Sequence, residues 1–308
     1  MTGIDVIDLL KSAFLGLVEG ITEWLPISST GHMILVDEFV KLNVSEEFWN
    51  MFLVVIQLGA ILSVCVLYFH QLNPFSPSKG AEGRKATWSL WGKIVLGCIP
   101  AAVIGLPLND FMDEHFYNSY VVAGALIFYG VAFILIENWR AKKRSELAAP
   151  RGAHFAAGAA ADDNADFGTI TNIDDLTWKT ALGIGAFQVL SLVPGTSRSG
   201  STIIGGLLLG CTRAVAAEFT FFLAIPVMFG ASLLKIVKFV LKGAAMSANE
   251  WAIMGVGLVV AFVVSLAAIR WLTGFVRKHD FKVFGWYRIV LGVLVLAYFL
   301  AIAPALGL

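Results

Sequence analysis

The stretch GITEWLPISSTGHMILV, residues 20–36, interrupts an apolar region with an unusual density of polar side chains. It contains Glu23, Pro26, three consecutive hydroxyl residues and His32, and Glu19 stands one helical turn before Glu23. Proline breaks helices, and ionisable groups are costly in apolar surroundings, so this stretch needs protein or a polar cavity around it. The composition of the whole chain therefore has to be considered before this stretch can be interpreted.

The composition of the whole chain indicates a polytopic membrane protein. Hydrophobic residues make up 58% of the 308 residues, charged residues only 14%, and the mean hydropathy is +0.79. Soluble domains have about 25% charged residues. A chain of this length can supply roughly six to eight membrane-spanning helices. The formal net charge of zero argues against a nucleic-acid partner.

Two apolar regions, 8–40 and 178–210, are each broken near the middle, at PISSTG and at PGTSRSG. Irregular backbone at membrane depth requires protein or water to satisfy its polar groups, so we expect re-entrant helical hairpins here. Six other runs are long enough to span a membrane. These are residues 51–70, 93–108, 119–139, 216–241, 251–272 and 289–308.

The two broken regions resemble one another when the sequence is aligned with itself at an offset of 168 positions. The few identical residues could also arise by chance in a sequence with such a biased composition. Each half would consist of one hairpin and three spans. Because three is an odd number, the second half would have the opposite orientation in the membrane to the first. We therefore expect repeats at 1–144 and 178–308, joined by a flexible cytoplasmic linker at 145–177 that is rich in Ala, Gly and Asp. The matched residues are Lys11, Ala13, Pro26 and Ser29, which fall on Lys179, Ala181, Pro194 and Ser197.

Positive charge gives the expected orientation. Lys and Arg gather in 71–93, in 140–144 and in 277–288, whereas 109–119 has neither residue. Because cytoplasmic loops are enriched in Lys and Arg, the first three segments should face the cytoplasm. Both termini and the mouth of the first hairpin would then lie outside.

Glu19 and Glu23 are spaced i, i+4 and should lie on one helix face. Two buried carboxylates require a cation or a shared proton, unless the helix lies at headgroup level and leaves them hydrated. A lone histidine is usually a packing residue. His32 is expected to be functional because carboxylates, hydroxyls and an arginine would converge with it.

The second motif, PGTSRSGST at 194–202, is suited to a phosphate. Small residues at and around Gly195 allow close backbone approach, and Arg198 offers a fork of N–H groups that matches phosphate oxygens. A following helix N-terminus favours an anion. The alternative, a glycine–serine kink between packed helices, does not explain the arginine. The hydroxyl donors are Thr196, Ser197, Ser199 and Ser201.

EGITEWLPISSTGH and PGTSRSGST strongly resemble the motifs of the undecaprenyl-diphosphatase family of bacterial inner-membrane enzymes, also called bacitracin-resistance proteins. The similarity covers nearly the whole chain, and the 145–177 linker is longer than the family pattern. The resemblance implies removal of the terminal phosphate from undecaprenyl diphosphate, which regenerates the carrier lipid for peptidoglycan precursors. It also implies an active site between the hairpins that opens to the periplasm and uses a divalent cation, Mg²⁺ or Ca²⁺.

The resemblance assigns roles motif by motif. Glu19 and Glu23 become the cation-binding or acid/base carboxylates, and Ser29 with Thr30 and His32 becomes the hydrolytic group. Arg198 becomes the catalytic phosphate clamp, and the remaining residues contact substrate. The nucleophile stays open between Ser29, His32 and a metal-bound water. The substrate-contacting set is Ser28, Thr30, Gly195, Thr196, Ser197 and Ser199.

The main rival is a secondary transporter or flippase for a polyprenyl phosphate lipid, because inverted repeats with broken helices are typical of alternating access. Only the first hairpin contains Glu19, Glu23 and His32, however, and only the second contains Arg198. This asymmetry favours an enzyme. The expected partners are the bilayer and a polyprenyl diphosphate lipid, and a homodimer is left open.

Overall fold

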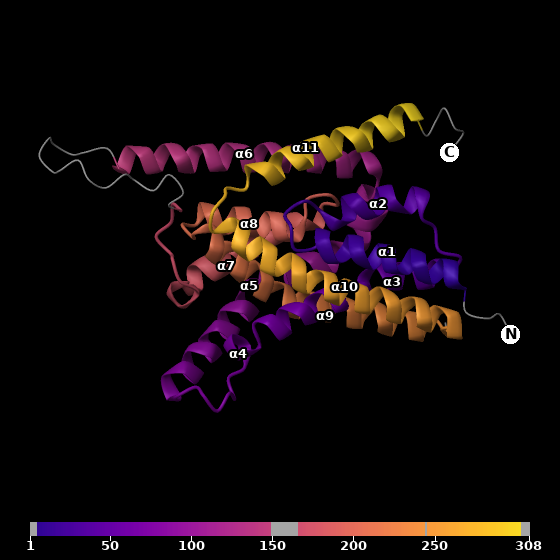
Figure 1. Ribbon diagram of the computed structural model, residues 1–308, viewed down its shortest axis with the longest axis horizontal. Helices are drawn as coiled ribbons and strands as arrows, with labels where there is room; N and C mark the ends of the chain where they lie inside the picture. Colours follow the sequence, from indigo (N-terminus) through magenta and orange to yellow (C-terminus); the bar gives the residue numbers. More distant parts are fainter. Residues whose placement is uncertain (1–4, 149–165, 244, 303–308) are drawn as a thin grey trace, which may run out of the picture.

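The computed structural model describes residues 5–148, 166–243 and 245–302, and within these ranges regular structure is helical apart from one isolated bridge between Ile170 and Cys211 (Figure 1). Six of the described helices are long and apolar enough to cross a membrane, as predicted. They are α3 (Glu46–Leu67), α5 (Ala81–Phe116), α6 (Ser119–Ala148), α9 (Arg213–Leu241), α10 (Ala248–Val276) and α11 (Lys282–Ala297, followed by a π turn at Tyr298–Ile302).

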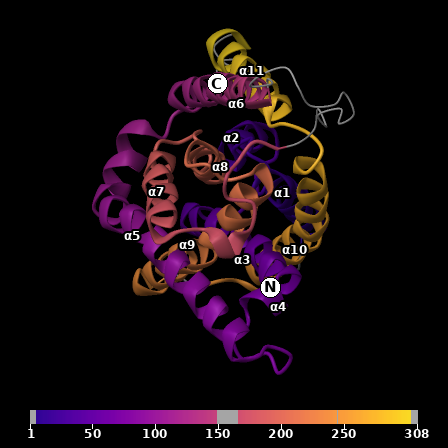
Figure 2. The same cartoon turned by 90° about the vertical axis from the view of Figure 1, so that its left-hand side faces the viewer.

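The two broken regions each form a pair of short helices. The first pair is α1 (Val6–Thr22) and α2 (Ser29–Phe39), and the second is α7 (Trp178–Gln188) and α8 (Arg198–Leu208), which is preceded by the 3₁₀ turn Val189–Leu192. In Figure 1, α1 and α2 lie towards the end of the molecule that bears both termini, and α7 and α8 lie towards the other end. The end-on view places α2 and α8 inside a ring that includes α5, α6, α10 and α11 (Figure 2).

Glycines allow the short helices to pack closely against the long ones. A Cβ atom on Gly16 of α1 would lie 2.6 Å from the carbonyl oxygen of Gly257 on α10. One on Gly185 of α7 would lie 2.0 Å from the carbonyl oxygen of Gly97 on α5. Helix association in membranes depends on such close approach. The backbone of each broken pair is therefore fixed against a long helix.

Two expected loops are helical. Residues 71–93 start within the short helix α4 (Phe69–Leu72) and include the beginning of α5 from Ala81, so Arg84, Lys85 and Lys93 lie on α5. The expected outer loop 109–119 is mostly the end of α5. Pro100 and Pro107 both lie inside α5, and the helix continues past each of them.

Of the flexible linker predicted over 145–177, residues 145–148 instead continue α6, and residues 166–177 contact the helices. Ile173 and Leu176 are buried in the main apolar cluster, and Asp166 forms ion pairs with arginines of α6 and α9. These contacts fix 166–177 against the helices. Residues 149–165 of the predicted linker, and 303–308 of the last predicted span, lie outside the described residues.

Candidate active site

Glu19 and Glu23 lie on one face of the first broken helix, as their spacing predicted. Glu23 follows the last residue of α1 but keeps helical dihedral angles, and its N–H donates to the Glu19 carbonyl oxygen at 3.0 Å. Both side chains are buried, with 1% and 7% of their surface exposed. Glu19 is close enough to be influenced by the charges of Glu23 and Arg198.

The Glu23 carboxylate joins the two broken regions. One of its oxygens, Oε1, accepts a hydrogen bond from Arg198 Nη2 at 3.0 Å, and the other accepts from the Ser29 hydroxyl at 2.8 Å. Arg198 also donates to the Thr220 carbonyl oxygen of α9. The structure thus brings together the acid, the hydroxyl and the guanidinium that the sequence singled out from segments 175 residues apart.

His32 lies on α2 one turn after Ser29, but its ring nitrogens bind other groups. Nδ1 contacts the Ser28 carbonyl oxygen at 2.7 Å, so Nδ1 carries a proton. Nε2 contacts the Tyr287 hydroxyl at 2.7 Å, and the two rings stack. Ser29 is therefore paired with Glu23 and not with His32 in this structure.

Ser28 and Ser197 have the same structural role at the starts of α2 and α8. Each has a positive φ, 73° and 71° respectively, and each side-chain oxygen accepts from the backbone N–H three residues later. Serine and other small polar residues are preferred at this position because they satisfy a free helical N–H. These hydroxyls cap helices, and Ser197 Oγ also bonds Ser199 Oγ at 3.1 Å.

Several residues predicted to contact substrate are part of the scaffold. Gly195, with φ 89°, packs against α6, where a Cβ would lie 2.5 Å from the Val122 carbonyl oxygen. Thr196 and Ser199 are buried, and Ser199 donates to the carbonyl oxygens of Glu23 and Leu25. Thr30, in contrast, is only partly buried. The roles of all these residues in binding stay predictions.

Arg288 was missed as a site residue. It was taken as a loop cation before the last span, but it lies within α11 and is fully buried. Its guanidinium donates to the carbonyl oxygens of Pro26, Gly195 and Thr196, which belong to both interruptions. The signal in the sequence was an arginine inside an apolar helix rather than at its end.

The residues fit a divalent cation in part. Glu19 Oε1 is buried and has no hydrogen-bond partner, which leaves an oxygen available beside the Glu23 carboxylate. Mg²⁺ and Ca²⁺ prefer oxygen ligands, and Mg²⁺ is often bound by one or two carboxylates together with substrate phosphates. Among the described residues, no group of three His, Cys, Asp or Glu side chains could hold a metal alone. The two glutamates would thus need phosphate oxygens as further ligands.

The fold and the site define a polytopic membrane protein with a buried carboxylate–hydroxyl–guanidinium centre between two interrupted helices. Residues 12–294 match the family model described as bacitracin resistance protein BacA. The chain belongs to this family.

Three curated relatives are named undecaprenyl-diphosphatase. The protein from Enterococcus faecalis is 54% identical over 95% of this chain and 98% of its own. The one from Limosilactobacillus fermentum is 53% identical over 97% of this chain and all of its own. The one from Acetivibrio thermocellus is 52% identical over 96% of this chain and all of its own.

Proposed function

We infer that this protein is an integral-membrane undecaprenyl-diphosphatase, which hydrolyses undecaprenyl diphosphate to undecaprenyl phosphate and inorganic phosphate. The relatives that bear this name are more than half identical to it along nearly its whole length. The structural observation that supports the chemistry is the Glu23 carboxylate, which contacts a serine hydroxyl and an arginine at once. The flippase alternative finds no comparable support.

Ser29 is the proposed nucleophile. Its hydroxyl already donates to Glu23 Oε2, so Glu23 is placed to accept the proton as Ser29 Oγ attacks the terminal phosphorus. The new Oγ–P bond forms while the bridging P–O bond breaks, and its electron pair leaves with undecaprenyl phosphate. Water then hydrolyses the phosphoserine, which releases phosphate and returns a proton to Ser29.

Arg198 is the proposed phosphate clamp. In the structure its guanidinium is paired with the buried Glu23 carboxylate. A guanidinium has five N–H donors, so Arg198 can hold Glu23 and phosphate oxygens together. Its charge would then stabilise the oxygens of phosphorus in the transition state.

His32 is the proposed base for the second step. Because Nδ1 carries the proton shared with the Ser28 carbonyl oxygen, Nε2 of the neutral ring is the basic nitrogen. It accepts from Tyr287 in the structure, and a water in place of that contact would be activated one helical turn from Ser29. Glu23 would by then hold the proton taken from Ser29, so it is not the base for this step.

Glu19 and Glu23 would hold a divalent cation, which when bound would neutralise phosphate charge and increase the electrophilicity of phosphorus. This proposal rests on the unpartnered Glu19 oxygen. Purified protein tested for phosphate release from farnesyl and undecaprenyl diphosphate, with and without chelator, checks both points. We expect the wild type to release phosphate in detergent, where there is no transmembrane gradient, and to lose this activity when chelator is added. Release unaffected by chelator would contradict the cation, and no release under any condition would contradict the enzyme.

We also propose an inverted repeat of 1–144 and 178–308, with re-entrant hairpins and with the site opening to the periplasm of an inner membrane. The packing supports the symmetry: α1 packs on α10, α7 packs on α5, and α6 packs on α11. Both described ends of the chain lie at one end of the bundle (Figure 1). A homodimer stays a prediction.

Cysteine labelling tests the orientation. Cysteines at Asn118 and Ser145, at the two ends of α6, are introduced after replacement of Cys65, Cys98 and Cys211. An impermeant thiol reagent should label Asn118→Cys in intact cells and Ser145→Cys only after lysis. Labelling of both in intact cells would contradict the proposed orientation.

A further inference from the structure

The side of the candidate active site formed by α2 is less buried than the side formed by α8. Glu19 and Glu23 are buried at the end of α1. Ser29 and His32 on α2 are only partly buried. Two of the eleven residues of α2 are buried, compared with nine of the eleven in α8. α2 therefore separates the site from the surface of the molecule less than α8 does.

Tyr287 of α11 lies against His32 on this less buried side of the site. Its hydroxyl is 2.7 Å from His32 Nε2, and the two rings stack with an angle of 11° between their planes. Tyr287 is 45% exposed, whereas Arg288, the next residue, is fully buried. α11 thus directs one side chain into the interruptions and the preceding one to the surface, so Tyr287 connects His32 to the exterior of the helix bundle.

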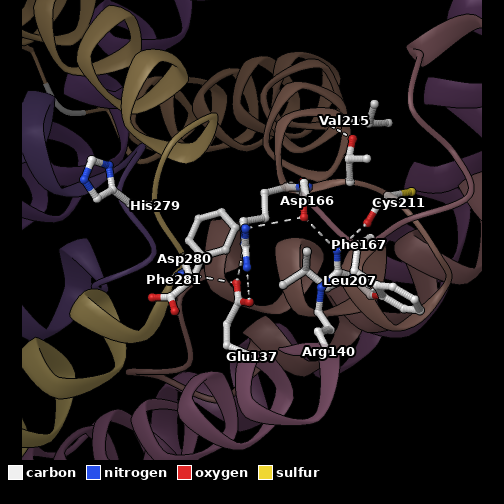
Figure 3. Close-up of polar contacts among 12 residues, drawn as sticks. Glu137, Arg140, Asp166, Phe167, Leu207, Cys211, Val215, His279, Asp280 and Phe281 are labelled. Atoms are coloured by element: carbon white, nitrogen blue, oxygen red, sulfur yellow. Dashed lines mark hydrogen bonds and ion pairs between the residues drawn. The ribbon is translucent and has the colours of Figure 1, made fainter. Parts of the chain in front are cut away.

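The backbone of α11 is held on both sides of Tyr287. Arg288 donates to three backbone carbonyl oxygens of the two interruptions. At the start of the helix, the Phe281 N–H donates to Glu137 Oε1 of α6 at 3.1 Å, as Figure 3 shows. Glu137 is itself paired with Arg213 of α9 at 2.7 Å. Movement at Tyr287 is therefore confined to its side chain, which can swing outward because nearly half of it is already exposed.

The contact with Tyr287 occupies the nitrogen that the proposed second step needs. Nδ1 of His32 already shares its proton with the Ser28 carbonyl oxygen at 2.7 Å, which fixes the orientation of the ring without Tyr287. While Nε2 accepts from the Tyr287 hydroxyl, its lone pair cannot accept from a water molecule. Hydrolysis through His32 thus requires the Tyr287 hydroxyl to move away.

We propose that Tyr287 closes a lateral entrance between α2 and α11, and that the isoprenoid chain of the lipid diphosphate opens this entrance by displacing the Tyr287 ring. The proposal rests on the proposed function, because the displaced hydroxyl frees His32 for hydrolysis. A substrate with a long apolar chain arrives from within the bilayer, so the chain can replace the ring without exposing apolar surface to water. Tyr287 is then a positioning residue that acts through His32, whose Nε2 becomes available to water when the lipid is bound.

The kinetics of Tyr287→Phe test the proposal, because this variant keeps the ring and removes the hydroxyl. Opening the entrance would no longer break a hydrogen bond, so kcat/KM for farnesyl diphosphate should rise about fivefold while kcat stays within about twofold of the wild type. The matched control is Tyr68→Phe, which removes a hydroxyl that contacts Thr273 Oγ1 at 3.5 Å and should leave both parameters unchanged. A fall in kcat/KM or in the melting temperature of Tyr287→Phe would overturn the proposal and give Tyr287 a structural role.

Binding of a non-hydrolysable analogue, farnesyl methylenediphosphonate, separates the entrance from the chemistry. Its Kd should fall about fivefold in Tyr287→Phe. In a His32→Ala background, where the hydroxyl has no partner ring, adding Tyr287→Phe should change the Kd by less than about twofold. An unchanged Kd in Tyr287→Phe, or the same gain in both backgrounds, would overturn the proposal. The expected Kd values without phosphate release from farnesyl diphosphate would contradict the proposed function alone.

Photo-crosslinking locates the isoprenoid chain of the bound analogue. The photoreactive residue p-benzoylphenylalanine replaces either Trp286, which is 59% exposed beside Tyr287, or Val259, which is 62% exposed on α10 and serves as the control. Irradiation with the radiolabelled analogue should label the protein through position 286 and much more weakly through position 259. Equal labelling at the two positions would overturn the entrance between α2 and α11.

Discussion

The two interruptions, residues 23–28 and 193–197, share one backbone conformation but are followed by different side chains. Ser28 and Ser197 adopt nearly identical left-handed φ values and cap the following helices through Gly31 and Gly200. The residue after the cap differs: Ser29 in the first interruption and Arg198 in the second. A left-handed conformation at a serine is strained and persists only where surrounding contacts enforce it. The strained backbone at Ser28 and Ser197 is therefore a structural feature that both interruptions share, and they differ in the side chains that follow it.

The same comparison corrects the alignment of the two regions. The caps are 169 positions apart, whereas the sequence matched residues 168 positions apart. With the structural offset, Gln188 corresponds to Glu19, and Arg198 corresponds to Ser29. The buried acid Glu19 thus has a neutral counterpart, and Ser29, the proposed nucleophile, has a cationic one.

The largest expected effect on kcat comes from substitutions in and next to the first interruption. Ser29→Ala and Glu23→Gln should each lower kcat by about 10³-fold, because one removes the proposed nucleophile and the other its proposed base. Phosphate release under saturating substrate measures this. The double variant should lose little more than either single variant, since the two groups act as a unit.

Ser12→Ala is the matched control for this pair, because Ser12 lies on α1, the helix that ends at Glu23, and its buried hydroxyl donates to the Ile253 carbonyl oxygen at 2.6 Å. It should cost about 1 kcal/mol of stability and leave the rate normal. A Ser29→Ala variant that keeps a normal rate would eliminate the serine nucleophile and leave His32 or water.

Arg198→Lys, at the corresponding place in the second interruption, should lower kcat by about 10²-fold while the protein keeps its melting temperature. A lysine gives a point charge in place of a fork of donors. The parallel variant is Arg288→Lys, which loses donors to three carbonyl oxygens and should lower the melting temperature instead. If Arg198→Lys also unfolds the protein, Arg198 holds the interruptions together and its clamp role fails.

Gly195→Ala tests the backbone of the second interruption. The alanine would have to keep a φ of 89° with its Cβ 2.5 Å from the Val122 carbonyl oxygen, so we expect a loss of about 3 kcal/mol or more in unfolding free energy. Gly243→Ala is the control, because Gly243 has a φ of 73° but open space around it. It should cost only about 1 kcal/mol. Equal losses in urea unfolding would mean that the contact with α6 contributes nothing.

Gln188→Met should have the smallest effect. Both polar atoms of this side chain are buried without a hydrogen-bond partner, so an apolar residue of similar shape should be neutral or slightly stabilising. Phosphate release should stay within about threefold of the wild type, whereas Glu19→Gln at the corresponding position should lose about 10²-fold. A tenfold or greater loss in Gln188→Met would place Gln188 in the active site.

The sequence by itself determined the membrane class, the six long helices and the places where two further helices break, because these follow from composition and from local backbone chemistry. It also indicated the motifs that match the family. The boundaries of α5 were not predictable, because proline inside a long membrane helix is tolerated when neighbouring helices support it. The packing of 166–177 was missed for a similar reason, since its composition is polar and its anchors lie on α6 and α9.

Only the tertiary structure decided which polar groups pair. Glu23 rather than His32 accepts from Ser29, and His32 instead meets Tyr287 of α11, 255 residues away. Arg288 looked like a flanking loop cation until the fold placed it between the two interruptions. Hydrogen bonds between distant segments depend on how the helices pack, and the spacing of residues along the chain does not reveal this packing. The residue types at the site are thus local features of the sequence, and their partners were set by the way the ends of α1, α2, α8 and α11 meet.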